Sequence, residues 1–243
     1  MRRLELPGRE GRSYVVVVTG KDHGDSNGLV DLRVINSRQA SKSACLDAQK
    51  VLAKADAAYA AAQAVTRAVI STPGVSSDKS YQEAAAGYRN AATQLEVQGP
   101  SPLLAQAQLA EASLLNLDVD DAAGAKARAV LADQTYASLR DDYGKARAQA
   151  IEGAANADIA VSVKRASATD ATSQVSTMLA EARRQLASVV AFHTRRQEFY
   201  DAGYAQNYIG LAFWYEARYD EAIHGYQKAL PFYERLHDHA GQA

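Results

Sequence analysis

Several residues near the N-terminus have side chains that can bind a metal ion. Between Asp22 and Asp31, carboxylate, hydroxyl and amide groups follow one another closely. The run Asp25-Ser26-Asn27-Gly28 matches part of a calcium-binding loop, which needs oxygen ligands at alternate positions and a closing glutamate. His23 stands where the first acid should be, and Val34 where the glutamate should be. We therefore interpret this run as a hairpin turn and keep calcium binding as the alternative.

Cys45 and His23 are the pair that could serve as thiol nucleophile and base. Such a pair also needs an orienting group and an oxyanion pocket, and no nearby residue supplies them. A cysteine at the head of an alanine-rich helix is usually a small buried residue. As the single cysteine of the chain, Cys45 excludes an internal disulfide and a multi-cysteine metal site. We expect no catalytic group, no cofactor and no metal.

Three further polar clusters have structural interpretations. His237 and His239, with His224 upstream, are metal-ligand candidates, but residues two apart do not share a helix face, which favours a turn. The acids Asp118, Asp120 and Asp121 lie where a helix is expected to begin and would complement its dipole. The basic pairs 183–184 and 195–196 are too widely spaced for one patch, which indicates a solvated face and no nucleic-acid site.

A polar and aromatic stripe near the C-terminus is the best candidate for binding a partner. Tyr204, Asn207, Leu211 and Trp214 are spaced three, four and three residues apart, so they share one helical face. Asn207 could hydrogen-bond an extended peptide, while Tyr204 and Trp214 offer rigid apolar contact. The alternative is that the stripe packs against the preceding helix, expected over 170–200.

Composition restricts the class of protein. The chain has 243 residues, 47% of them apolar, with 27 Lys+Arg against 28 Asp+Glu. This balance gives no reason to expect a nucleic acid or an anionic membrane as partner. No run approaches the roughly 20 apolar residues that cross a bilayer. The basic N-terminus lacks the apolar run of a secretory signal. We expect a soluble protein.

Two kinds of secondary structure divide the chain into a β segment, 1–37, and a helical domain, 38–243. The runs 14–19 and 29–35 predict a β-hairpin that either leans on the helices or is the end of a larger β domain. After them the sequence predicts helices, beginning with an alanine-rich one over 41–70 and another over 77–98. Helix breaks are predicted at 72–74, 99–102, 118–121, 141–144 and 167–170.

The last full repeat, about 203–236, resembles a tetratricopeptide repeat. In that motif the first helix carries an apolar and a small residue followed by an aromatic one, here Ile209, Gly210 and Phe213. The second helix carries a small, an aromatic and a small residue, here Ala222, Tyr226 and Ala229. Small residues let the two helices touch, and the aromatic rings fill the space beside them. The resemblance implies a mainly α fold, a right-handed superhelix of helical hairpins (an α-solenoid).

The repeat departs from the family pattern at two positions. Ala217 replaces the glycine usual at the turn, and Pro231 is expected to remove a hydrogen bond and kink the second helix. Weaker copies of the pattern lie upstream. Ala84, Tyr88 and Ala91 repeat the second-helix spacing, and Leu109-Ala110 and Ile151-Glu152-Gly153 are candidates for first-helix contacts.

The order of the features resembles the N-terminal region of bacterial CHAT proteins, in which a caspase-like peptidase domain follows a tetratricopeptide array. This resemblance implies a protein–protein interaction scaffold, non-enzymatic itself, that controls a linked peptidase. The peptidase domain is not in this sequence, so we interpret the chain as a fragment of a larger protein. The alternatives are a segment that associates with itself and an enzyme with an unrecognised site.

Overall fold

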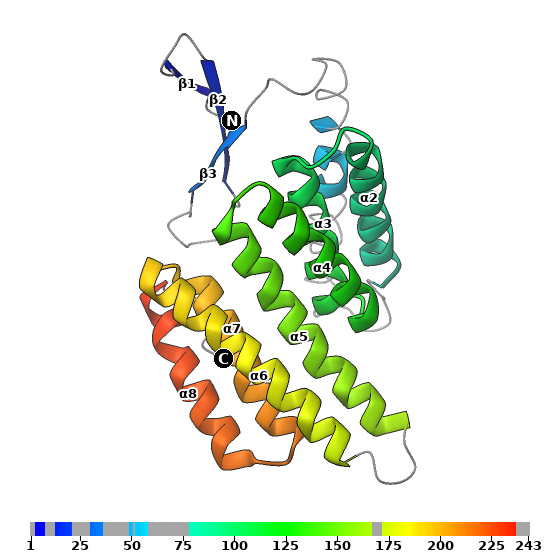
Figure 1. The fold of residues 1–243 in the computed structure, drawn as a ribbon, viewed down its shortest axis with the longest axis vertical. Coiled ribbons are helices and arrows are strands. Elements are labelled where there is room, and N and C mark those ends of the chain that lie inside the picture. Colours follow the sequence, from blue (N-terminus) through cyan, green and yellow to red (C-terminus); the bar gives the residue numbers. More distant parts are fainter. Residues whose placement is uncertain are drawn as a thin grey trace, which may run out of the picture.

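The computed structural model describes residues 3–7, 13–20, 30–35, 49–50, 52–57, 78–166 and 172–236. The described chain is mainly helical, and consecutive helices pack side by side (Figure 1). The long helices, in chain order, are α2 Asp78–Glu96, α3 Pro102–Leu117, α4 Ala122–Ser138, α5 Asp142–Ala166, α6 Thr172–Arg196, α7 Phe199–Tyr215 and α8 Tyr219–Arg235. Residues 49–50 and 52–57 are also helical, within the stretch predicted as the first helix.

The strands form a sheet larger than the expected hairpin. β1 Arg3–Pro7, β2 Ser13–Gly20 and β3 Val30–Ile35 make an antiparallel sheet of three strands with β2 in the centre. Val16 lies opposite Leu4 on one side and Val34 on the other. The two-strand prediction missed β1, because the short run Arg3–Pro7 ends in proline, which weakens its strand signal. The predicted turn between β2 and β3 lies outside the described residues.

Capping side chains fix where α3, α4 and α5 begin, at the helix breaks that the sequence predicted. The Ser101 hydroxyl accepts a hydrogen bond from the Leu104 amide at 3.2 Å, and Pro102 takes the first helical position. Asp121 caps α4 through the Gly124 amide at 2.8 Å, and Asp141 accepts from the Gly144 amide at 2.9 Å where α5 begins. Each cap satisfies an amide that the first helical turn leaves without a partner.

Three of the turns between helices have the same backbone hydrogen bonds. Arg140, Gln197 and Ala217 have φ values of 56°, 61° and 60°, in the left-handed region. The amide of each donates to the carbonyl three residues back, and the next amide donates to the carbonyl five residues back. This is the Schellman motif, which usually has glycine at the left-handed position. Ala217 therefore has the left-handed conformation that glycine usually has in this motif.

The core of the described helices consists mostly of alanine. Small side chains bring the helices close together, and larger residues fill the space beside them. One close backbone approach joins α7 and α8, where a Cβ added to Gly225 would lie 2.6 Å from the Gly210 Cα. The Tyr226 ring covers Gly210, and Leu186 covers Gly153 of α5 in the same way. Ile151-Glu152-Gly153 therefore provides a small-residue contact, as predicted.

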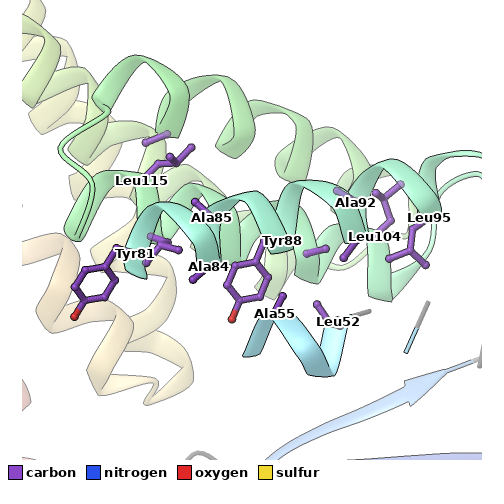
Figure 2. Packing of buried hydrophobic residues seen from close by; sticks show 14 of the residues in the cluster. Leu52, Ala55, Tyr81, Ala84, Ala85, Tyr88, Ala92, Leu95, Leu104 and Leu115 are labelled. Atoms are coloured by element: carbon purple, nitrogen blue, oxygen red, sulfur yellow. The ribbon is translucent and has the colours of Figure 1, made fainter. Parts of the chain in front are cut away.

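The N-terminal helices pack by the same rule (Figure 2). Ala84, Tyr88 and Ala91 of α2 are all buried, in agreement with the weak repeat found in the sequence. Ala55, from the helical residues 52–57, lies against Gly87, where an added Cβ would be 3.2 Å from the Ala55 Cβ. The Tyr88 hydroxyl donates to Asp56 at 2.7 Å. In α3 the expected pair is only partly a contact: Leu109 is buried, but Ala110 is partly exposed.

A second set of contacts skips one helix. Each helix from α2 to α8 packs against the next along the chain, and α5 also packs against both α3 and α7. The odd-numbered helices α3, α5 and α7 therefore touch in sequence. Pro231 does not end the helix, since α8 continues through it to Arg235. A proline removes one hydrogen bond, and burial of Ala229 and Tyr233 on either side of it holds the helix against α7.

Replacing Ala217 by glycine should stabilise the protein. A left-handed alanine costs about 1–2 kcal/mol in conformational strain, whereas glycine loses more freedom on folding, which leaves a net gain of about 0.5–1 kcal/mol. Urea denaturation followed by circular dichroism measures the change. Ala187→Gly, an exposed position within α6, is the matched control and should destabilise by about 1 kcal/mol. A loss of stability in Ala217→Gly would contradict the assigned turn.

Replacing Gly225 by alanine should destabilise the protein by about 1–3 kcal/mol, because the new methyl group meets the Gly210 backbone and α7 and α8 must separate. The same denaturation measurement tests this. His224→Ala, at the exposed neighbouring position of α8, should change the free energy of unfolding by less than about 0.5 kcal/mol. Equal effects of the two substitutions would exclude the close helix approach.

Candidate partner-binding surface on α7

The candidate stripe belongs to α7, and three sides of this helix are already covered. One side faces α5, one faces α6 and one faces α8. The remaining side carries Tyr204, Asn207, Leu211 and Trp214. The contacts on the three covered sides determine how this open side is positioned.

Polar side chains fix the side of α7 that faces α5. Asp201 accepts hydrogen bonds from the Arg147 guanidinium and the Tyr143 hydroxyl, both at 3.2 Å. At the other end, the Tyr215 hydroxyl donates to Asp158 at 3.0 Å. These contacts hold both ends of α7 against α5, so its rotation about its own axis is fixed.

A hydrogen bond links α7 to α3 across α5. The Asn116 amide nitrogen donates to the Tyr208 hydroxyl at 2.9 Å, and both side chains are buried. Burial raises the pKa of Tyr208 to about 12. Tyr204 lies beside it with the ring centroids 5.0 Å apart, and burial raises the Tyr204 pKa well above its usual value. Both phenols are therefore neutral near pH 7.

Glycine and glutamine form the side of α7 that faces α8. Gly203 lies against Phe232 and Tyr233, and Gly210 lies against Tyr226. Between these glycines, the Gln206 side chain donates to the Gly225 carbonyl at 3.3 Å. Ala217 continues this line into the turn. Because the two helices lie so close here, the larger side chains of α7 are on its other sides.

The side of α7 that faces α6 is held by arginine. The Arg183 guanidinium lies 4.3 Å from the Phe213 ring centroid and pairs with Glu216 at 2.8 Å. The Arg218 guanidinium also lies near the Phe213 ring, 4.7 Å from its centroid. Arg183 is therefore part of a helix contact and not of a free basic face.

The open side of α7 divides into a buried and an exposed part. Tyr204 and Leu211 are partly buried and pack against the core cluster that contains Tyr208. Asn207 is exposed, and Trp214 is 53% exposed with its ring 4.9 Å from that of Tyr219. The stripe thus both packs and presents side chains: its inner half joins the core, and its outer half faces solvent.

One exposed residue of this surface was missed in the sequence. Tyr200 is also exposed and lies seven residues before Asn207, which lies seven residues before Trp214. Residues seven apart share a helix face, so the spacing contained this signal. The surface is therefore a line of an aromatic, an amide and an aromatic side chain along α7.

The other candidates form no chemical site within the described part of the chain. His23, Cys45, His237 and His239 lie outside the described residues, and His224 is an exposed residue of α8. The described part of the chain contains no group of three or more histidine, cysteine, aspartate or glutamate side chains that could hold a metal ion. Of the predicted helix-start acids, Asp121 caps α4, and Asp120 has a left-handed φ of 58° in the turn before it.

None of the described helices is both long and apolar enough to span a bilayer. Comparisons with protein-family models and with curated proteins found no match for this chain.

Asp158 should make the stability depend on pH. Burial raises its pKa above the usual aspartate value of 3.8, and the hydrogen bond from Tyr215 only partly offsets this. The folded state then binds the proton more tightly than the unfolded state, so stability falls as the pH rises from 3.8 through the folded pKa. Asp158→Asn keeps an acceptor for Tyr215 and removes the charge.

The free energy of unfolding of Asp158→Asn, minus that of the wild type, should therefore increase between about pH 3.5 and pH 7. Urea denaturation at several pH values measures both proteins. The titrating groups that the two proteins share cancel in this difference. A difference for Asp158→Asn that decreases with pH would contradict the assigned burial.

Proposed function

We propose that this chain is a non-catalytic helical-repeat scaffold that binds a protein or a peptide through the open side of α7. The observation that carries the proposal is the exposed line of Tyr200, Asn207 and Trp214 on a helix whose other three sides are packed. Aromatic side chains give rigid contact area, and an asparagine side chain can donate to and accept from an extended backbone. Because α7 is already held rigidly by its neighbours, it loses little conformational freedom when a partner binds.

The arrangement of the helices supports the α-solenoid part of the proposal. Odd-numbered helices contact one another in sequence, and each of α4 and α6 packs against the odd-numbered helices before and after it. Three turns share one hydrogen-bond pattern. A stack of similar hairpins has these two properties, because each unit repeats the contacts of the previous one. Together with the pattern of its last repeat, this arrangement supports our proposal that the chain is of the tetratricopeptide type.

In a stack of this kind the function follows from shape. The odd-numbered helices form one layer, and their outward side chains make a continuous surface for a partner. The resemblance to CHAT proteins leads us to propose that the partner or the linked domain is a peptidase whose activity this region controls. That part of the proposal rests on analogy of arrangement.

Site-specific crosslinking tests the surface directly. A photoreactive phenylalanine analogue placed at Asn207 should crosslink a partner in lysate of the source organism, and the same analogue at Gln134, an exposed position on α4, should not. Mass spectrometry identifies the products. If α7 binds a partner, we expect one protein to be enriched among the products crosslinked from position 207 and not among those from position 134.

A paired substitution completes the test. Asn207→Ala/Trp214→Ala should reduce capture of that protein at least about tenfold, which corresponds to about 1.4 kcal/mol of binding free energy. The matched variant Leu131→Ala/Gln134→Ala changes an exposed face of α4 and should retain it. Circular dichroism confirms that both variants are folded. Equal capture by the two variants would exclude this surface of α7.

A further inference from the structure

A second exposed apolar surface lies on α8. Tyr219, Ile223, Tyr226 and Leu230 follow one another at intervals of four, three and four residues, so they form one stripe along the helix, named here the α8 stripe. Tyr219 and Ile223 are each 53% exposed, and Leu230 is 37% exposed. Tyr226 is partly exposed because one side of its ring covers Gly210. Large apolar side chains exposed in a row mark an interaction surface.

The position of the α8 stripe shows what kind of element fits it. Helices α4 and α6 each pack against two odd-numbered helices, whereas α8 packs extensively against α7 alone among the described helices. Figure 1 shows α8 at the edge of the helical body. The stripe has the four-and-three spacing with which one helix packs against another. The occupant that continues this packing is therefore an amphipathic helix.

The charges beside the stripe select the partner. Asp220 and Glu234 are exposed, and with Gln227 between them they form a row at seven-residue intervals next to the stripe. Neither carboxylate has an ion pair within the described part of the chain. Lys228 lies on a different side of α8, about 140–160° around the helix from Ile223 and Leu230. The stripe is thus bordered by negative charge at both ends.

A second copy of α8 fits this surface poorly. If two stripes paired antiparallel with Ile223 opposite Leu230, then Asp220 would lie next to Glu234 of the other copy. Parallel pairing would instead place the row of Asp220 and Glu234 beside the flank of Ala222 and Ala229, which is buried against α7 and offers no positive charge. Like charges at a contact oppose association, and the antiparallel pairing would form two such negative pairs. A helix with basic residues beside its apolar face would instead be attracted to the carboxylates next to this stripe.

We propose that the α8 stripe is a docking surface for a basic amphipathic helix. The helix lies along α8 with its apolar side chains over Ile223, Tyr226 and Leu230, and its lysine or arginine residues pair with Asp220 and Glu234. Trp214, which contacts Tyr219, forms the border between this surface and the one on α7. The two surfaces are separate, because Asn207 belongs to the first and Ile223 and Leu230 to the second.

Two synthetic peptides provide the probe. Both have about 18 residues, to match the length of α8, with leucine at intervals of three and four. One has lysine on both flanks of the leucine face, and the other has glutamate at the same positions. Fluorescence anisotropy of labelled peptide with the full chain measures the dissociation constants. The lysine peptide should bind roughly tenfold more tightly, with a preference that decreases at high salt.

Substitutions on α8 separate charge from apolar contact. Asp220→Lys/Glu234→Lys should reverse the preference in favour of the glutamate peptide, and Glu181→Lys on α6 should not change it. Ile223→Asp should reduce binding of the lysine peptide at least roughly tenfold, as should Leu230→Asp. Leu131→Asp on α4 is the matched control, because Leu131 is 37% exposed, as is Leu230. Asn207→Ala should leave peptide binding unchanged, which distinguishes this surface from the one on α7.

The opposite outcomes are equally clear. Equal affinity for the two peptides, or binding of neither, would overturn the proposal. Light scattering of the chain alone provides an independent check. A molar mass that rises with concentration and returns to the monomer value in Ile223→Asp would assign the stripe to a second copy and would also overturn it.

Discussion

The close approach of helix backbones across alanine and glycine is the constraint on which the rest of this structure depends. Between α7 and α8 there is no room for a methyl group at Gly225, and the Tyr226 ring and Leu186 each lie directly over a glycine of a neighbouring helix. Such contacts bury little apolar area per residue, so stability depends on how many backbone and Cβ atoms are brought into van der Waals contact. A single added methyl group is therefore more disruptive here than in a core of large side chains.

Alanine faces resemble one another, and this makes the buried polar groups important for the choice of partner helix and register. The Glu111 side chain on α3 is fully buried and pairs with Arg89 of α2 at 2.7 Å and with Arg128 of α4 at 3.1 Å. A buried carboxylate without its partners is strongly destabilising, so a shift of α2 or α4 along its axis that separates Glu111 from its arginine would raise the free energy of the folded state. The hydrogen bond of Asn116 with Tyr208 acts in the same way between α3 and α7. We infer that apolar packing brings the helices together and that polar contacts select one arrangement.

Local signals made much of the fold predictable, and long-range contacts explain most of what was missed. Ser101 and Asp121 act within three residues of their own position, so their caps could be inferred from sequence. Asn116 and Tyr208 are 92 residues apart, and nothing near either of them indicates the other. The helix–helix contact at Gly225 was also missed, because the family pattern directs attention to Ala222 and Ala229. Tyr204 and Leu211, half of the candidate stripe, pack against the core cluster that contains Tyr208, a contact that their spacing alone did not indicate.

The same packing rule explains why the exposed aromatic side chains gather on the last two described helices. Between α3 and α6, each helix is covered by the one before it and the one after it, and its small side chains are used on both sides. Helix α7 has three covered sides and α8 has one, so residues such as Trp214 and Ile223 remain exposed. Large side chains at these positions would be incompatible with alanine-type packing on every side. Their exposure is the observation on which the surfaces proposed for α7 and α8 rest, because such side chains do not suit the packing used between the alanine-rich helices.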